Sequence, residues 1–210
     1  MKVLIGTTNP AKLRMFEQVL DGYPIEFVTL RDLGITAEPE EMGEDPAQNA
    51  AIKAAFYGQF ADYVICNDSG LYFDDMALDD PRQPGLHIRT PRGKRLDDEE
   101  MILYYSQLVH SLGGKALAYY LDGFAVKTPA GLQTFMKSQE EGRENAFWML
   151  DTPCEERRPG WPLDSLSLLM DGTPYLKRGV EHKPSSAGTT KRAWVQFLAS
   201  ALGLSPLEEA

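Results

Sequence analysis

The chain has 210 residues, of which 43% are hydrophobic and 25% are charged, and this ordinary globular composition excludes collagen, mucin and coiled-coil proteins. Its 21 Lys and Arg residues against 31 Asp and Glu residues give a net charge of −10, which disfavours a nucleic-acid polymer or an anionic membrane surface as a partner. A small anion stays compatible with this charge, because one concave site can gather a few basic groups.

The two cysteines, Cys66 and Cys154, belong to neither a CxxC motif nor a Cys/His cluster. This pattern predicts neither a disulfide framework nor a zinc site, and it favours a reducing compartment. The amino-terminal apolar stretch is too short for a signal peptide, and no stretch approaches the roughly 18 apolar residues of a membrane span. We therefore expect a cytoplasmic protein.

The first elements in chain order are a strand and a helix. The apolar run 2–8 predicts the strand, and Asn9 followed by Pro10 predicts the start of the helix. A second helix is expected from Asp45 and Pro46 to about residue 60, with Gln48 completing a capping-box pattern. Its apolar stripe is expected at Ile52, Ala55 and Phe56.

The remaining expected elements make the sheet mixed. A strand is predicted over 62–66, a helix over 98–112, an antiparallel hairpin over 116–139, a loop over 143–165 and a last helix over about 190–202. A strand followed by a helix is how an α/β protein begins, and the hairpin adds antiparallel pairing. No linker is clear enough to divide the chain, so we expect one domain over residues 1–210.

Two segments could carry chemistry. Thr7, Asn9 and Lys12 lie where a strand end runs into a helix start, and free backbone N–H groups and a lysine there suit an anion. The alternative is a helix cap followed by a surface lysine. Asp68 directly follows the predicted strand 62–66, at a strand tip where open α/β sheets bind ligands, although on its own the segment is better explained as an ordinary Asp-Ser-Gly turn.

The second predicted helix adds two polar side chains. Asn49 and Lys53 are one turn apart and therefore share a face of this helix. Lys53 is the one basic residue in an otherwise apolar stretch, and it either serves a site or extends its ammonium group to solvent.

Taken in this order, the segments resemble the Ham1 family, the inosine and xanthosine triphosphate pyrophosphatases. The likeness covers nearly the whole chain. The matching residues are Thr7, Asn9 and Lys12; Gly43 and Glu44 leading into Asn49, Ala50, Lys53 and Ala54; Asp68, Ser69, Gly70 and Leu71; Pro84, Gly85 and Arg89; and Trp161 with Asp164.

The chain also departs from the family pattern. Met15 and Gln48 stand where the family commonly has Glu. Residues 188–193 (GTTKRA) stand in place of its carboxyl-terminal Ser-His-Arg signature, and Lys183 is placed like its upstream lysine.

The resemblance implies a mixed-sheet, two-lobed α/β fold with a nucleotide in the cleft between the lobes, and commonly a homodimer. It implies hydrolysis of non-canonical purine nucleoside triphosphates (ITP, dITP, XTP) between the α- and β-phosphates, which cleanses the nucleotide pool. Mg²⁺ would be bound by Glu44 and Asp68, and the catalytic residues would be Asp68, which orients or deprotonates the water, and Lys53. The implied substrate-binding residues are Thr7, Asn9, Lys12, Asn49, Ser69, Trp161, Asp164, Lys183 and Thr190.

Two other interpretations stay open. The departures at Met15, Gln48 and residues 188–193 are compatible with a nucleotide-binding protein of the same fold that has lost turnover, or with a pyrophosphatase for another modified nucleotide. Asp68 and Lys53 favour an enzyme, because a pure binder has less need of a carboxylate beside the phosphates.

Overall fold

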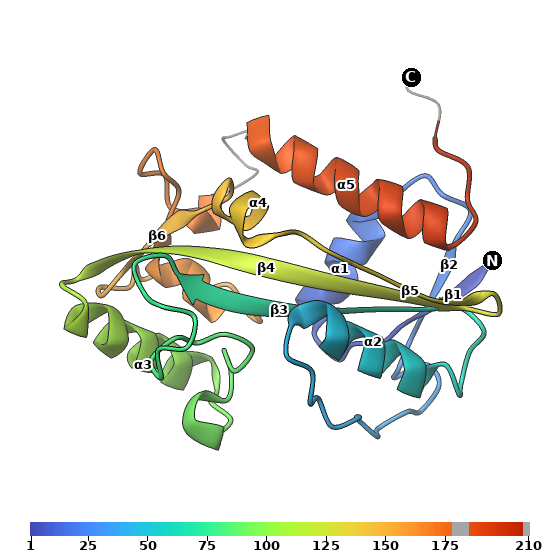
Figure 1. Ribbon diagram of the computed structural model, residues 1–210, viewed down its shortest axis with the longest axis horizontal. Helices are drawn as coiled ribbons and strands as arrows, with labels where there is room; N and C mark the ends of the chain where they lie inside the picture. The colour runs from blue at the N-terminus through green and yellow to red at the C-terminus, as the bar shows by residue number, and fades with distance from the viewer. Residues whose placement is uncertain (178–184, 208–210) are drawn as a thin grey trace. The chain divides into compact units, whose positions relative to one another are not determined.

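The computed structural model describes residues 1–177 and 185–207, without the side chains of residue 92 and of residues 185–191 (Figure 1). The chain forms two compact units. Unit 1 comprises Met1–Ser69, Asp122–Met136 and Gly188–Ala210, and unit 2 comprises Gly70–Leu121 and Lys137–Ala187. Within the described residues, no helix is both long and apolar enough to cross a membrane.

The strands form one mixed sheet in the order β2-β1-β3-β4-β6-β7, with β5 also paired to β4. Strand β1 (Lys2–Ile5) is parallel to β2 (Glu26–Thr29) and to β3 (Val64–Phe73). Strand β4 (Lys115–Thr128) is antiparallel to β5 (Gly131–Met136) and to β6 (Phe147–Leu150), which pairs with β7 (Ser167–Leu168). The expected mixed-sheet α/β class is confirmed.

The strands of unit 1 are covered by helices on both faces (Figure 1). One face packs against α1 (Pro10–Val19) and α5 (Ser185–Ala201), and the other packs against α2 (Pro46–Tyr57). Alternate strand residues divide between the two faces, as the strand period of two requires. The first face contains Val3, Ile5, Ile65, Phe124 and Val126, and the second contains Leu4, Val64, Cys66 and Ala125.

Unit 2 is built around α3 (Asp98–Ser111), whose buried residues Met101, Ile102, Tyr105 and Val109 pack with strand residues such as Phe147. The other short elements of this unit are η1 (Pro91–Gly93), α4 (Gln139–Arg143), η2 (Pro162–Leu166) and η3 (Tyr175–Lys177). The expected loop over 143–165 is therefore wrong in part, because β6 and all of η2 except Leu166 lie within it, and the five residues of η2 are buried.

The apolar faces of two helices also differ from expectation. In α2 the buried face is formed by Ala50, Ala54 and Tyr57, whereas Ala55 is exposed. Alanines and a tyrosine form this face because α2 lies close to the sheet. In α3, Leu103 is 60% exposed although it is one of the apolar residues of the predicted helix 98–112. The last helix begins five residues earlier than predicted, at Ser185.

The approach of α2 to the sheet generates a stability prediction at Gly123 in β4. A Cβ at this position would lie 2.2 Å from the backbone nitrogen of Ala47, at the start of α2. We expect Gly123→Ala to lower the free energy of unfolding by about 3 kcal/mol, because backbone rather than a flexible side chain must move.

Gly131→Ala is the comparison variant, measured alongside by urea unfolding. Gly131 begins β5 with φ +139° and has open space where a Cβ would lie, so this change should cost only about 1 kcal/mol of backbone strain. A larger loss in Gly131→Ala than in Gly123→Ala would contradict this account of the contact.

Candidate active site

Asp68 lies inside β3, beyond the point where the parallel pairing of the sheet ends. Strand β1 pairs with β3 only through Leu4 with Val64 and Ile5 with Ile65, and β3 continues to Phe73. The prediction that the strand ends at residue 66 was wrong, since Asp68 is in the middle of a ten-residue strand. Its side chain nevertheless lies past the carboxyl end of β1, at the edge of a parallel sheet where ligands commonly bind.

Helix α2 holds the Asp68 carboxylate with two side chains one turn apart. Asn49 Nδ2 donates to Asp68 Oδ2 at 3.1 Å, and Lys53 Nζ donates to Asp68 Oδ1 at 3.2 Å. The side chains of Lys53 and Asp68 are only 12% and 14% exposed, so Lys53 does not merely extend into solvent. Burial alone would lower the pKa of Lys53, but the charges of Asp68 and Glu41 outweigh it and raise that pKa.

The segment before α2 supplies a second carboxylate, and it is Glu41. Lys53 Nζ lies 3.1 Å from Glu41 Oε2 as well as close to Asp68. Glu44, the residue predicted as a metal ligand, is exposed, and its backbone N–H donates to Gln48 Oε1. Glu41 was missed because it belongs to an acidic run in which nothing in the sequence distinguishes one carboxylate from another.

Asn49 also fixes the chain that enters α2. Its Oδ1 accepts a hydrogen bond from the backbone N–H of Gly43 at 2.8 Å, while its Nδ2 reaches Asp68. Asp45 caps the helix by accepting from the Gln48 N–H at 2.8 Å. Gln48 does not return a bond to the Asp45 N–H, so the predicted capping box is only half formed.

The start of α1 is capped by its own side chains. Asn9 Oδ1 accepts from the Ala11 N–H at 2.8 Å, and Thr7 Oγ1 accepts from the Asn9 N–H at 3.2 Å. The predicted cap is confirmed. Both oxygen atoms are therefore already used as acceptors, and an anion would be met by the Thr7 hydroxyl hydrogen, the Asn9 amide NH₂ group and Lys12.

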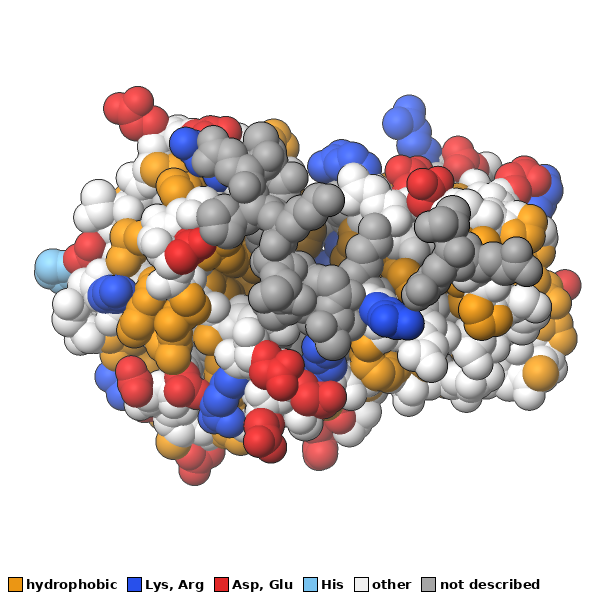
Figure 2. All heavy atoms as spheres, turned by 90° about the horizontal axis from the view of Figure 1, so that it is seen from above, with side chains coloured by type: hydrophobic (Ala, Val, Ile, Leu, Met, Phe, Trp, Pro, Cys, Tyr) orange, Lys and Arg blue, Asp and Glu red, His pale blue; other side chains and the backbone are white. Residues whose placement is uncertain are grey.

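Lys12 joins this group of charges from the first turn of α1. Burial and the nearby Lys53 lower the pKa of Lys12, whereas Asp68, Asp122 and Glu41 act in the opposite direction. Two lysines and three carboxylates thus influence one another, with a combined charge of −1. In the view of Figure 2, acidic and basic side chains are interspersed on the surface. The two lysines of the site are Lys53, whose side chain is 12% exposed, and the partly buried Lys12.

Ser69 follows Asp68 on β3, and its hydroxyl is already engaged. Ser69 Oγ donates to Asp122 Oδ1 at 2.6 Å, across to β4. A hydroxyl has one hydrogen, so Ser69 in this arrangement cannot also donate to a phosphate oxygen. Asp122 was not predicted, because its position in the middle of an apolar strand gave no motif.

The carboxylates of this site suit a magnesium ion that is also bound by substrate phosphates. Among the described residues, no group of three or more His, Cys, Asp or Glu side chains could hold a metal. Mg²⁺ in phosphate-processing sites is commonly held by one or two carboxylates and by substrate phosphates, and it prefers oxygen ligands. Asp68 and Glu41, joined through Lys53, fit an ion of that kind.

Two of the residues predicted to bind the base, Trp161 and Asp164, belong to unit 2. Trp161 is half-buried at the start of η2. The Asp164 carboxylate, 7% exposed, accepts from Arg158 Nη1 at 2.9 Å, so it is already paired with an arginine whose side chain is 39% exposed. Lys183 lies outside the described residues, as does the side chain of Thr190.

Arg89 of the Pro-Gly-x-x-x-Arg segment is linked to the same loop. Arg89 Nη1 lies 2.8 Å from Asp98 Oδ1, and Asp98 Oδ2 accepts from the Gly160 N–H at 3.2 Å. These contacts fasten the residue before Trp161 to the start of α3. Arg89 therefore acts within unit 2 as an anchor of the Trp161 loop.

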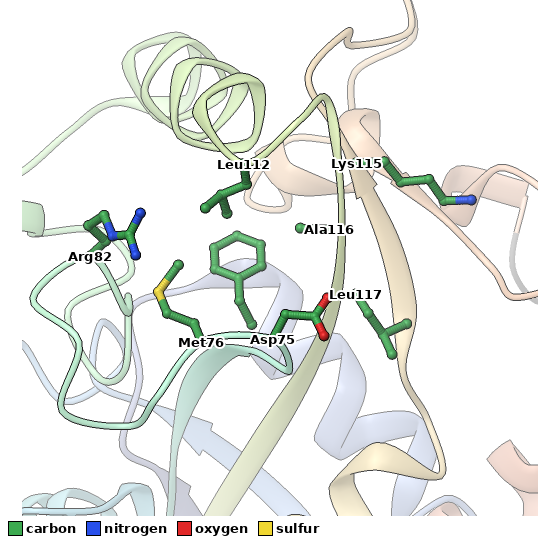
Figure 3. Close-up of a pocket in the computed structure, with 8 residues that line it drawn as sticks. Asp75, Met76, Arg82, Leu112, Lys115, Ala116 and Leu117 are labelled. Carbon is green, nitrogen blue, oxygen red and sulfur yellow. The ribbon is translucent and has the colours of Figure 1, made fainter.

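A separate cavity of about 110 Å³ in unit 2 contains none of the predicted site residues (Figure 3). Its charged lining residues include Arg82, which pairs with Asp80, and Lys115, whose ammonium lies 3.8 Å from the centre of the Trp148 ring. With these cations already engaged, the cavity is a weaker candidate than the Asp68 cluster.

The fold and the cluster define a class: α/β proteins with a mixed sheet and a charged site at the carboxyl end of its parallel strands. Within that class, the chain belongs to the Ham1 family, whose sequence profile matches residues 3–143. The Ham1 protein of Staphylococcus aureus has a similar fold, with a TM-score of 0.68 at 18% identity over 95% of this chain and 99% of that one.

Curated relatives carry the name dITP/XTP pyrophosphatase. The protein of Thermoanaerobacter sp. (strain X514) is 38% identical over 101 residues, which are 48% of this chain and 49% of the relative. The protein of Listeria monocytogenes (strain EGD-e) is 34% identical over 146 residues, 67% of this chain and 68% of the relative. The match thus spans about half the length of the first of these relatives.

The contact between Asn49 and Asp68 generates a prediction about stability and pH. Asn49→Asp places a second carboxylate against Asp68, and like charges at this distance raise the pKa of one of them. The folded state then binds a proton more tightly than the unfolded state, so the stability lost at about pH 7 should be partly recovered as pH falls toward about 5.

Asn49→Ala is the uncharged comparison, since it loses the same hydrogen bonds without adding a charge. Its loss of about 1–3 kcal/mol should not depend on pH over that range. The measurement is urea unfolding of both variants at the two pH values. Parallel behaviour of Asn49→Asp and Asn49→Ala would show that no repulsion with Asp68 exists.

Proposed function

We propose that the protein hydrolyses non-canonical purine nucleoside triphosphates, such as dITP, ITP and XTP, to the monophosphate and pyrophosphate. The observation that carries this proposal is the Asp68 carboxylate, held by Asn49 and Lys53 beside Lys12. The names of the relatives from Thermoanaerobacter and Listeria agree with it.

The phosphates are the part of the substrate that this cluster suits best. Phosphoryl transfer needs charge neutralisation and an oriented nucleophile more than covalent help from the protein. Lys12 and Lys53 neutralise phosphate oxygens, and the Thr7 and Asn9 side chains at the start of α1 donate to them. Asn49 serves the substrate indirectly in this proposal, by holding Asp68.

Asp68 orients the attacking water and takes its proton. A carboxylate can accept a proton from water only while it is ionised. The Asn49 hydrogen bond fixes the direction of the second oxygen, so that the water meets a defined acceptor.

A magnesium ion is the proposed cofactor, with Asp68 and Glu41 as the carboxylates that hold it and Glu44 as the originally predicted alternative in the same segment. When bound, such an ion supplies positive charge to the phosphates and polarises the bond that breaks. The charge count supports this requirement: two lysines and three carboxylates sum to −1, which by itself repels a triphosphate.

The base is assigned to residues outside this cluster. Trp161 is the proposed stacking residue, and Lys183 and Thr190 stay predicted contacts. Asp164 is bound to Arg158, so we propose that the two side chains act together at the base. A homodimer, a cytoplasmic location and a role in cleansing the nucleotide pool also stay predictions.

A second function is a nucleotide-binding protein without turnover, motivated by Met15, Gln48 and the replaced Ser-His-Arg signature. The arrangement around Asp68 favours the enzyme, because a carboxylate in a phosphate site weakens binding unless chemistry or a cation needs it.

The decisive experiment is a panel of nucleoside triphosphates with Mg²⁺, assayed for monophosphate and pyrophosphate. We expect release from dITP, ITP or XTP, and loss of activity when the metal is chelated. We expect Asp68→Asn to reduce kcat by about 10²–10⁴-fold or more, while the protein still folds. Binding of a triphosphate without turnover by the wild-type protein would favour the second function, and wild-type rates in Asp68→Asn would remove Asp68 from the mechanism.

Trp161 allows a separate test of the base. An aromatic ring stacks on any purine, so Trp161→Ala should weaken ITP and ATP alike, by about 1–3 kcal/mol. Trp161→Phe keeps a ring and is the matched control. The measurement is kcat/KM for both nucleotides, and a selective loss of ITP in Trp161→Ala would show that Trp161 discriminates between bases instead of stacking on them.

A further inference from the structure

Arg158 and Trp161 are the first and last residues of one tight turn in unit 2. The two residues between them are Pro159 and Gly160, and Pro-Gly is the usual centre of a type II turn. Gly160 has the positive φ that such a turn needs, +83°, and the Trp161 N–H donates to the Arg158 carbonyl oxygen at 2.9 Å. The Cα atoms at the two ends of a turn lie within about 7 Å of each other. The sequence therefore holds an arginine next to the residue proposed to stack on the base.

The Arg158 guanidinium is fixed at two of its nitrogen atoms. Nη1 donates to Asp164 Oδ2 at 2.9 Å, and Nη2 donates to the Leu176 carbonyl oxygen at 2.6 Å. Because the group is planar, contacts at two different nitrogen atoms set its direction as well as its position. They use two of its five N–H groups, and the described residues supply no further acceptor. The guanidinium is thus oriented before a ligand arrives and has donors left for one.

These remaining donors are accessible and carry little net charge. The Arg158 side chain is 39% exposed, whereas that of its partner Asp164 is 7% exposed, so a ligand meets the arginine. The positive charge of the arginine is offset by the negative charge of the aspartate. Such a pair suits a neutral group that is rich in hydrogen-bond acceptors better than it suits a phosphate.

One edge of the purine base is a group of this kind in some nucleotides only. A 6-oxo purine presents two acceptors side by side, N7 and O6, which match two N–H groups of an arginine. A 6-amino purine presents N7 and an NH₂ group, which is a donor. A guanidinium has no acceptor, so one of its N–H groups and the amino group would face each other without a partner. An arginine at this edge therefore favours hypoxanthine, xanthine and guanine over adenine.

We propose that Arg158 is a specificity-determining residue: its guanidinium, held by Asp164, binds N7 and O6 of the base that stacks on Trp161, and thereby disfavours adenine nucleotides. The inference rests on the proposed function for the class of ligand and for the stacking role of Trp161. It divides the work at the base among three residues. Trp161 contributes affinity for any purine, Asp164 orients the arginine, and Arg158 distinguishes a 6-oxo from a 6-amino group.

The alternative is a purely structural ion pair. Arg158 would then only tie η2 to η3, through Asp164 and Leu176. Its replacement would lower stability, or lower activity towards every nucleotide by the same factor. The ratio of activities between nucleotides separates the two roles, because a structural defect leaves this ratio unchanged.

The test is kcat/KM of wild-type protein and Arg158→Lys for dITP, dGTP, dATP and 7-deaza-dITP, in which a carbon replaces N7. Lysine keeps a positive charge beside Asp164 but lacks the planar fork. We expect the ratio of dITP to dATP to fall about 10- to 100-fold, the range of one bidentate contact to a base. The preference for dITP over 7-deaza-dITP should largely disappear. The ratio of dITP to dGTP should follow the wild type, because guanine presents the same two acceptors.

Arg157→Lys is the matched control. Arg157 is the preceding residue, its side chain is 37% exposed, and it pairs with Glu99. It should keep all the ratios of the wild type. The double variant Arg158→Ala with Asp164→Asn leaves no charge in the pair, and it replaces Arg158→Lys, with the same expected ratios, should that variant not fold. Equal losses for all four nucleotides, or an unchanged ratio of dITP to dATP, would overturn the proposal.

Dissociation constants of the same nucleotides separate this proposal from the proposed function. A wild-type protein that hydrolyses no triphosphate, but binds dITP more tightly than dATP and loses that preference in Arg158→Lys, refutes the hydrolysis and supports the role of Arg158. A wild-type protein that hydrolyses dITP and dATP equally well, and binds them equally tightly, overturns the role of Arg158 and leaves the hydrolysis standing.

Discussion

The ion pair between Lys53 and Asp68 is the interaction on which the candidate site depends. Both side chains are largely buried, and removing one partner of such a pair leaves an uncompensated charge that typically costs about 3–5 kcal/mol. Here the cost is shared, because Asp68 also accepts from Asn49, and Lys53 also pairs with Glu41. The cluster can therefore lose one charge, as in Asp68→Asn, without the fold being lost.

The packing of α1 and α2 against the sheet brings the side chains of this cluster together around the end of β1. Helix α2 approaches the sheet closely through Ala50 and Ala54 and thereby brings Asn49 and Lys53 to Asp68 on one face. Helix α1 packs on the other face through Phe16, with Lys12 one turn earlier. The packing of α2 therefore also places its charged and polar side chains. The small residues that let the helix approach the sheet closely determine where Asn49 and Lys53 lie.

Much of the fold followed from local signals in the sequence. Asn9-Pro10 and Asp45-Pro46 marked helix starts, and the helical spacing of Asn49 and Lys53 placed both on one face. Long-range contacts were not readable in this way. Nothing local marks Glu41 within an acidic run, Asp122 within an apolar strand, or Arg158 as the partner of Asp164, because each acts on a residue distant in sequence or brought near by a loop.

The most direct measurement is a crystal structure of the wild-type protein with Mn²⁺ and an ITP analogue that resists cleavage between the α- and β-phosphates. The account predicts that the phosphates contact Lys12 and Lys53, and that the anomalous signal of the cation lies about 2.2 Å from an oxygen of Asp68. Phosphates bound in the cavity lined by Phe73 and Lys115, or a cation remote from Asp68, would contradict it.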